Sequence, residues 1–361
     1  MPELDGVRGL AVLMTVAMHW QAAIRPGTGF DRVVVHVAAF GWLGVEIFFV
    51  LSGYLITGIL MRARAERPRF RSYLGRFMWR RALRIMPLYY AGVAVFFFVL
   101  PAVFTIRDPA YWAAHESQAW YWLFGVNWKM AIDGAASAPF LTSHFWSVAV
   151  EEQFYLVWPL LVWWTDSRRL PWLAVALWIG SIVARVPFAP SAAYPWHAVT
   201  PLHLDGLMAG ALLAWCATTG AWPSVAAVLR RLTIPALCLM VISILADSTM
   251  PALNAVALGT LMVATLTGSA NGWRAICRAS WLRRFGTYSY CIYLVHFPLE
   301  ALLQRVLPRL GIPEAWGSTM PYGAVFGVLL LGISTGVAAV SWRYFEQPLL
   351  TLKDARWTRK L

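Results

Sequence analysis

Apolar segments of about twenty residues follow one another along the whole chain, and each has the length that crosses the hydrocarbon core of a bilayer. They cover residues 7–24, 38–61, 86–106, 144–165, 171–188, 201–219, 232–247, 251–268, 286–307 and 321–341. Apolar residues make up 60% of the 361-residue chain and charged residues 13%, against about 25% charged in a typical soluble domain. The sequence therefore predicts an all-α polytopic membrane protein with about ten transmembrane helices.

Basic residues are concentrated in alternate connections between these segments, and this distribution predicts the orientation. With the N-terminus in the cytoplasm, most of the 30 Lys and Arg residues fall in inner loops and in the C-terminal tail. The outer loops then hold Arg25, Arg32, Arg107, Lys129 and Arg309. Cytoplasmic loops of membrane proteins carry such an excess, so both termini are predicted to be cytoplasmic. The net charge of +13 follows from this topology and does not indicate nucleic-acid binding.

Cysteine usage and the two ends of the chain give further expectations. The four cysteines lie in expected helices or on the inner side, and their spacing matches no zinc pattern, so neither a disulfide nor a metal site is expected. The first apolar segment begins almost at Met1 without a basic n-region, so a cleaved signal peptide is not expected. Residues 1–350 are expected to form one membrane domain, followed by a short basic cytoplasmic tail at 351–361 and no fused soluble domain.

The two longest connections carry distinctive side chains. The inner loop at 62–84 is rich in arginine, whose planar guanidinium groups form paired hydrogen bonds with phosphates. A bound polyanion would explain these charges, as would retention in the cytoplasm or attraction to anionic lipid. Arg80, Arg81 and Arg84 are the best-placed candidates because they lie at the foot of the third segment. The outer loop at about 107–143 is rich in tryptophan, which suits a sugar ring or, as we favour, the membrane interface.

Ionisable side chains inside the apolar segments predict a functional cavity, because such groups are costly in hydrocarbon and usually face the bundle interior. Arg8 and His19 are eleven residues apart, which places them on one helix face and about 16 Å apart along the axis. Glu151 and Glu152 point about 100° apart, so only one of them is expected to enter the cavity. The other groups expected at a similar depth, facing the same cavity, are Glu46, His203, Asp205 and His296.

A histidine beside a carboxylate is suited to removing a proton from a hydroxyl, because imidazole titrates near neutral pH and the acid holds its tautomer. We therefore predict a proton-transfer role for His19, with Arg8 on its face and Glu151 at its level. For His203 and His296 an ordinary hydrogen-bonding role between helices is favoured. Neither a Gly-x-Ser-x-Gly motif nor a zinc-type histidine pattern occurs in the sequence.

Six short sequence motifs occur along the chain, and their order is characteristic when they are taken together. They are Leu4–Leu10 with the Arg8-to-His19 spacing, Gly44–Ile56, Arg80–Pro87, Phe145–Tyr155, Tyr288–His296 and Phe345–Pro348. With these motifs the chain resembles the acyltransferase-3 family of integral-membrane acyltransferases over essentially its whole length. The resemblance implies transfer of an acyl group, usually acetyl, from cytosolic acyl-CoA to a hydroxyl. Acyl-CoA would be a co-substrate, with no permanently bound cofactor.

The resemblance also implies roles for individual residues. His19 would be the catalytic residue, Arg8 its motif partner with Asp5 beside it, and Glu151 an essential acid. The residues implied near the CoA entry are Arg80, Arg81 and Arg84. The remaining candidates for substrate contacts are Glu46, Trp146, His203, Asp205 and His296. At His203 the chain departs from the family pattern, because relatives commonly carry arginine two places before the aspartate of this motif.

The resemblance implies the acceptor only as a class. Many relatives acylate cell-envelope sugars or glycolipids at the bacterial cytoplasmic (inner) membrane, and others acylate macrolide-type molecules. Some carry an additional extracytoplasmic hydrolase-like domain, which this sequence up to Leu361 is not expected to contain.

Two mechanisms and two rival functions stay open. We expect CoA phosphates on the arginines and the thioester at His19, with direct transfer and an acyl-histidine intermediate as the two routes. A transporter or flippase of a lipid-linked glycan is the alternative from another class, and a structural subunit that binds anionic lipid is the third. Consumption of acyl-CoA separates the first function from both rivals. The sequence does not indicate an oligomeric state.

Overall fold

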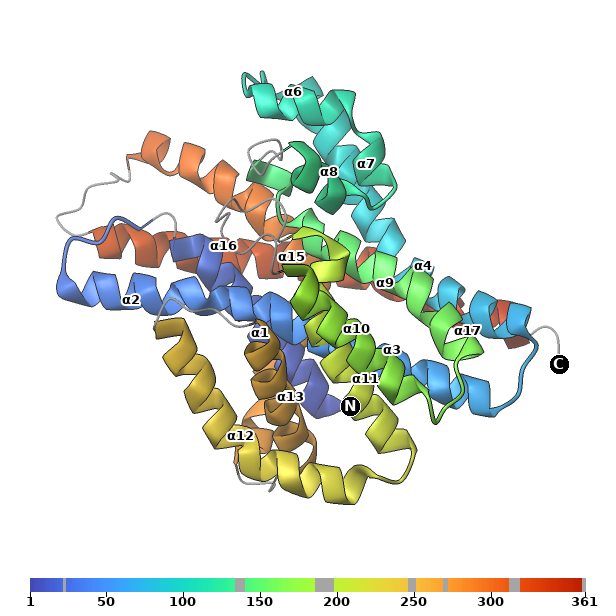
Figure 1. The fold of residues 1–361 in the computed structure, drawn as a ribbon. Coiled ribbons are helices and arrows are strands. Elements are labelled where there is room, and N and C mark those ends of the chain that lie inside the picture. Colours follow the sequence, from blue (N-terminus) through green and yellow to red (C-terminus); the bar gives the residue numbers. More distant parts are fainter. Residues whose placement is uncertain are drawn as a thin grey trace.

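The computed structural model describes residues 1–21, 24–133, 140–185, 198–245, 251–268, 272–311 and 319–358, which form helices without a strand (Figure 1). Each predicted apolar segment is mostly helical over its described residues. Four stretches among these residues are long and apolar enough to cross a membrane: Gly29–Ala65, Phe70–Val103, Trp222–Leu245 and Tyr322–Lys353. The all-α, multi-pass class is thereby confirmed, while ten crossings and the orientation of the termini stay predictions.

Six helices build the candidate site. They are α1 (Pro2–Gln21), α3 (Leu43–Ala65), α4 (Phe70–Ala94), α9 (Phe145–Trp164), α11 (Leu204–Thr218) and α15 (Ser280–Val306). Around them lie α2 (Gly29–Ala39), α5 (Leu100–Val103), α10 (Leu170–Arg185), α12 (Trp222–Leu245), α13 (Pro251–Thr267), α14 (Trp273–Arg278), α16 (Thr319–Ser341) and α17 (Gln347–Thr358). Figure 1 shows α12 and α13 packed together along one side of the molecule.

Some predicted boundaries fall on residues that the structure does not describe. The ends of the segments at 171–188 and 232–247 and the separator after Asp247 lie outside the described residues. Arg359 and Lys360 of the predicted basic tail also lie outside them. The described part of that tail continues as helix α17, which packs against α4.

Helix α1 packs lengthwise against α15, and glycine permits the close approach. A Cβ atom on Gly286 of α15 would overlap the main-chain carbonyl of Asp5, and one on Gly9 of α1 would overlap that of Leu282. Small residues at such contacts let helix backbones meet, which is how helices associate in a bilayer without a hydrophobic driving force. Helices α3 and α11 form the other extensive pair. These two pairs hold Arg8 in the middle of the bundle.

The tryptophan-rich outer loop forms three short helices, α6 (Pro109–Glu116), α7 (Ala119–Trp122) and α8 (Val126–Asp133), which cluster at one end of the molecule (Figure 1). Gln153 of α9 holds them: its Nε2 donates to the carbonyl of Phe124 at 2.7 Å and to Oδ1 of Asn127 at 2.9 Å. Its Oε1 accepts from Trp128 Nε1 at 3.1 Å. Burial raises the pKa of the Tyr121 hydroxyl to about 12. The loop is therefore a folded cap on α9.

Candidate functional site

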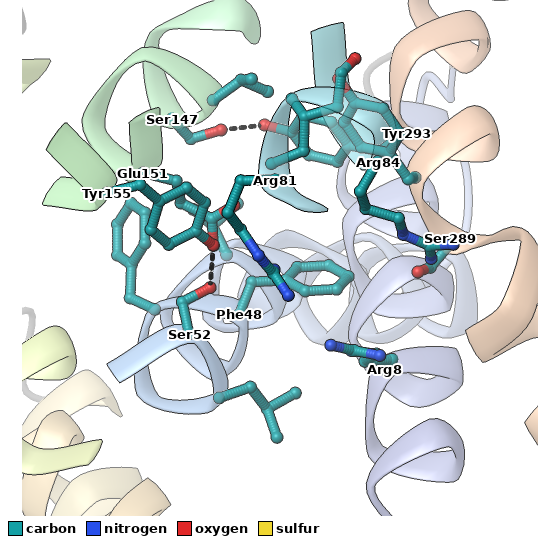
Figure 2. Close-up of a pocket in the computed structure, with 16 residues that line it drawn as sticks. Arg8, Phe48, Ser52, Arg81, Arg84, Ser147, Glu151, Tyr155, Ser289 and Tyr293 are labelled. Atoms are coloured by element: carbon teal, nitrogen blue, oxygen red, sulfur yellow. Dashed lines mark hydrogen bonds between the residues drawn. The ribbon is translucent and has the colours of Figure 1, made fainter. Parts of the chain in front are cut away.

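A chamber lined by polar residues lies between α1, α3, α4, α9 and α15 (Figure 2). Its free volume is about 110 Å³. The charged and hydroxyl-bearing residues that line it are Arg8, Ser52, Arg81, Arg84, Ser147, Glu151, Tyr155, Ser289, Tyr290 and Tyr293. We call this cavity the arginine chamber, because three arginines from two helices converge on it.

The carboxylate of Glu151 belongs to this chamber and is held by a hydroxyl. Ser52 Oγ donates to Glu151 Oε1 at 2.5 Å and lies 2.9 Å from the hydroxyl of Tyr155 (Figure 2). Glu151 and Tyr155 are four residues apart and therefore share one face of α9. Glu152 does not line the chamber, which confirms that only one of the two adjacent glutamates enters it.

The arginines give the chamber an excess of positive charge. Among the described residues that line it, Glu151 is one carboxylate facing Arg8, Arg81 and Arg84. The Arg81 guanidinium also lies 5.8 Å from the ring centre of Tyr155. Asp5 lies 3.7 Å from Arg8 but does not line the chamber. Such a local surplus of guanidinium groups favours an anionic ligand.

A second, wider cavity opens onto the same three arginines. This vestibule has a free volume of about 540 Å³ and is lined by Arg8, Arg81 and Arg84 together with Arg76, Arg80 and Lys353. Arg80 lines only the vestibule, whereas Arg81 and Arg84 line both cavities. The residues predicted at the CoA entry are therefore brought together around two cavities that share lining arginines.

His19 lies in a different cluster, formed with His144 and His296. Nδ1 of His19 is 2.8 Å from Nε2 of His296, and the ring of His144 is centred 5.3 Å from the ring of His296. Glu151, expected at the level of His19, accepts from Ser52 instead, and His296 is the side chain within hydrogen-bond distance of His19. Helix periodicity put Arg8 and His19 on one face correctly, but their separation along α1 puts them at opposite ends of the site.

Tyr293 stands between the arginine chamber and the histidine cluster. Its side chain lines the chamber, and its ring is centred 5.7 Å from that of His296. Its hydroxyl donates to the main-chain carbonyl of His144 at 2.9 Å and lies 2.5 Å from Ser147 Oγ. Figure 2 shows this Ser147–Tyr293 contact at the end of the chamber away from Arg8. One side chain therefore separates the two clusters.

The other predicted substrate residues form a third group, so the prediction of one shared cavity is wrong. His203 Nδ1 lies 3.7 Å from Glu46 Oε1, and the His203 ring is centred 4.8 Å from that of Trp146. Asp205 accepts two hydrogen bonds, at 2.9 and 3.0 Å, from Arg185 of α10. None of these residues lines the arginine chamber. Counting residues along each segment placed these side chains at one depth, but in the packed helices they face different neighbours.

Several residues of the site escaped the sequence-based prediction. Tyr155 could have been predicted as a neighbour of Glu151, because it follows Glu151 by one helical turn within the Phe145–Tyr155 motif. Ser52, His144 and Tyr293 also lie in or next to the motifs, but nothing in the sequence pairs them with Glu151 or His296. Arg185 had no local signal beyond a charge at the end of an apolar segment. Among the described residues, no three His, Cys, Asp or Glu side chains are placed to hold a metal ion.

Comparison with known proteins finds relatives of this sequence. The peptidoglycan O-acetyltransferase OatA of Listeria monocytogenes is 29% identical, over 96% of this chain and 55% of that protein. The acyltransferase MdmB of Streptomyces mycarofaciens is 25% identical, over 99% of this chain and 93% of that protein. The O-acetyltransferase OatA of Staphylococcus aureus is 24% identical, over 97% of this chain and 57% of that protein.

The chain thus spans about half the length of the OatA proteins that it matches. No solved structure matches it significantly. The acyltransferase domain family matches residues 1–339, which is most of the sequence. The chain belongs to the acyltransferase domain family.

Proposed function

We propose that this protein is a membrane O-acyltransferase that moves an acetyl group from cytosolic acetyl-CoA to a hydroxyl of a cell-envelope sugar. The observation that carries the proposal is the pair of neighbouring cavities that share Arg8, Arg81 and Arg84. A wide, cationic vestibule adjoins a narrow chamber, and a histidine cluster lies behind the far wall of that chamber. This order of groups matches an anionic nucleotide with a long, thin arm that ends in a thioester.

The vestibule is the docking site for the nucleotide of acetyl-CoA. Guanidinium groups make charge-assisted, paired hydrogen bonds with phosphates, and the vestibule holds several of them. The chamber, at about 110 Å³, is too small for the adenosine phosphates, so only the end of the thin pantetheine arm enters it. The nucleotide therefore stays outside while the thioester moves toward Tyr293 and the histidine cluster.

His19 acts as the general base. A free imidazole nitrogen of His19 takes the proton of the acceptor hydroxyl, and the resulting oxygen nucleophile forms a bond to the carbonyl carbon of the thioester. The carbon–sulfur bond breaks, CoA leaves as a thiolate, and the imidazolium of His19 returns the proton to that sulfur. For this step the side chain of Tyr293 must move aside, because it separates the chamber from His19.

The acceptor class is supported by the names of the relatives. The Listeria protein is named a peptidoglycan O-acetyltransferase, so a carbohydrate hydroxyl is the acceptor proposed for this chain. The chain covers almost the whole of acyltransferase MdmB, which keeps a macrolide-type small-molecule acceptor as the other outcome of the test.

The test uses membranes that contain the wild-type chain and acetyl-CoA labelled in the acetyl group. We expect release of free CoA together with label in an alkali-labile ester of an envelope polymer. Label in a small, extractable molecule would replace the sugar by the second acceptor class. Substrate movement without any consumption of acetyl-CoA would contradict the proposal and favour a flippase.

Removal of one vestibule arginine tests the docking site. Arg80→Ala is expected to raise KM for acetyl-CoA by about 5- to 30-fold, which corresponds to ~1–2 kcal/mol of binding energy. The value of kcat should stay near that of the wild type, because Arg80 does not line the chamber. Initial rates against acetyl-CoA concentration measure both constants.

The matched control for this prediction is Arg231→Ala, which removes an exposed arginine of α12 that lines neither cavity. An equal rise in KM in both variants would mean that general surface charge, and not the vestibule, attracts the nucleotide.

A further inference from the structure

We propose that His296 is a positioning residue: it holds the proton of His19 on Nδ1 and leaves Nε2 of His19 as the atom that accepts the substrate proton. The inference rests on the proposed function and adds to it the atom that does the chemistry. It comes from a chain of hydrogen bonds that links α1 to α15, two helices that approach each other closely at Gly9 and Gly286.

The chain starts at a group whose role is unambiguous. The main-chain carbonyl oxygen of Ile292 only accepts hydrogen bonds, and it lies 3.1 Å from Nδ1 of His296. Nδ1 of His296 therefore carries a proton, and in a neutral imidazole the other nitrogen, Nε2, is then an acceptor. Because Nε2 of His296 lies 2.8 Å from Nδ1 of His19, His19 donates from Nδ1 and keeps a lone pair on its own Nε2.

The surroundings of His296 fit the neutral ring that this chain requires. Its side chain is fully buried, and the rings of Tyr293, His144 and Phe297 are centred 5.3 to 5.7 Å from it. No acidic side chain of the described residues forms a hydrogen bond or ion pair with His296. A charge buried without such a partner is costly. His296 therefore acts as a fixed acceptor.

His19 is less enclosed than His296 and has one nitrogen to spare. Its side chain is half-buried, and Phe297 meets its ring edge-on at 4.1 Å between ring centres. No described residue forms a hydrogen bond with Nε2 of His19. A hydrogen bond to one ring nitrogen decides which nitrogen is basic, as the aspartate of a serine-protease triad does for its histidine. The neutral imidazole of His296 fixes the tautomer of His19 in the same way, but without a negative charge.

Two substitutions at position 296 separate positioning from simple packing. The amide oxygen of glutamine occupies roughly the place of Nε2 and can accept the proton of His19 Nδ1. The shorter amide of asparagine reaches only as far as Nδ1, so it can satisfy Ile292 but not His19. We expect His296→Gln to keep kcat within about tenfold of the wild type, and His296→Asn to lower kcat by about 10²–10⁴-fold. KM for acetyl-CoA should be unchanged in both, because neither cavity is lined by His296.

A second measurement does not depend on either variant. The ¹⁵N chemical shifts of labelled histidine in the wild-type protein distinguish the two tautomers, and His19→Gln identifies the resonances of His19. We expect a proton on Nδ1 and a bare Nε2. A proton on Nε2 overturns the proposal, as does wild-type kcat in His296→Asn or an equal loss in both position-296 variants.

Failure of the proposed function has a different signature. If the wild-type protein does not consume acetyl-CoA, the function itself is wrong, whereas the tautomer of His19 is still measured on the same sample. If the wild type turns over and depends on His19 but the two position-296 variants do not differ, only the positioning role is wrong.

Discussion

His19→Ala is expected to lower the rate of acetyl transfer by about 10²–10⁴-fold, the usual contribution of a general base. In the proposed reaction the imidazole removes the proton of the acceptor hydroxyl, and alanine leaves no titratable group in its place. The loss should fall on kcat, because His19 lines neither the vestibule nor the chamber, which are the cavities proposed to bind acetyl-CoA. Release of free CoA, measured with purified protein in lipid, gives both kinetic constants.

The matched control is His36→Ala. His36 lies on α2 and contacts the ring of Phe40 at 5.0 Å between ring centres, away from the histidine cluster. This variant should keep the wild-type rate, which shows that loss of one imidazole is not in itself damaging. Equal rates in His19→Ala and the wild type would remove His19 from the reaction.

Gly286→Ala is expected to destabilise the protein by about 1–3 kcal/mol, because a single methyl group collides with backbone and not with a flexible side chain. The new Cβ would overlap the main-chain carbonyl of Asp5, so α1 and α15 must separate. That separation would also move Arg8 and the His19–His296 contact, and activity should fall with stability. Unfolding of purified protein by titration with a denaturing detergent measures the difference in free energy.

Gly332→Ala provides the control on a neighbouring helix. Nothing lies within 4 Å of the Cβ position at Gly332 of α16, and the residue is exposed. Since glycine in a helix interior is less stable than alanine by roughly 0.5–1 kcal/mol, this variant should be unchanged or slightly more stable. Equal stability of the two variants would contradict the backbone contact between α1 and α15.

The sequence was sufficient for the class of fold and for the choice between two adjacent glutamates. Apolar segments of bilayer length predicted helices, and each segment is mostly helical over its described residues. The 100° step of the helix predicted that Glu151 and Glu152 face different ways, and only Glu151 lines the arginine chamber. Both are local properties, which depend on spacing within one segment.

The partners of the polar groups could not be predicted in the same way. Depth placed Glu46, Glu151 and His296 at one level, yet they lie in three separate clusters with His203, Ser52 and His19. Which side chains meet depends on how far each helix is rotated about its own axis when it packs. The spacing of residues within one segment does not reveal how far that helix is rotated against its neighbours.

The sequence by itself determined an all-helical membrane protein of the acyltransferase domain family, with arginine at one end of its first helix and histidine at the other. Only the tertiary structure decided that the arginines of α1 and α4 share two neighbouring cavities and that His19 pairs with His296. The physical reason is the close packing at Gly9 and Gly286, which brings the backbones of α1 and α15 together. That contact fixes how α1 and α15 are rotated against each other and so brings His19 of α1 next to His296 of α15.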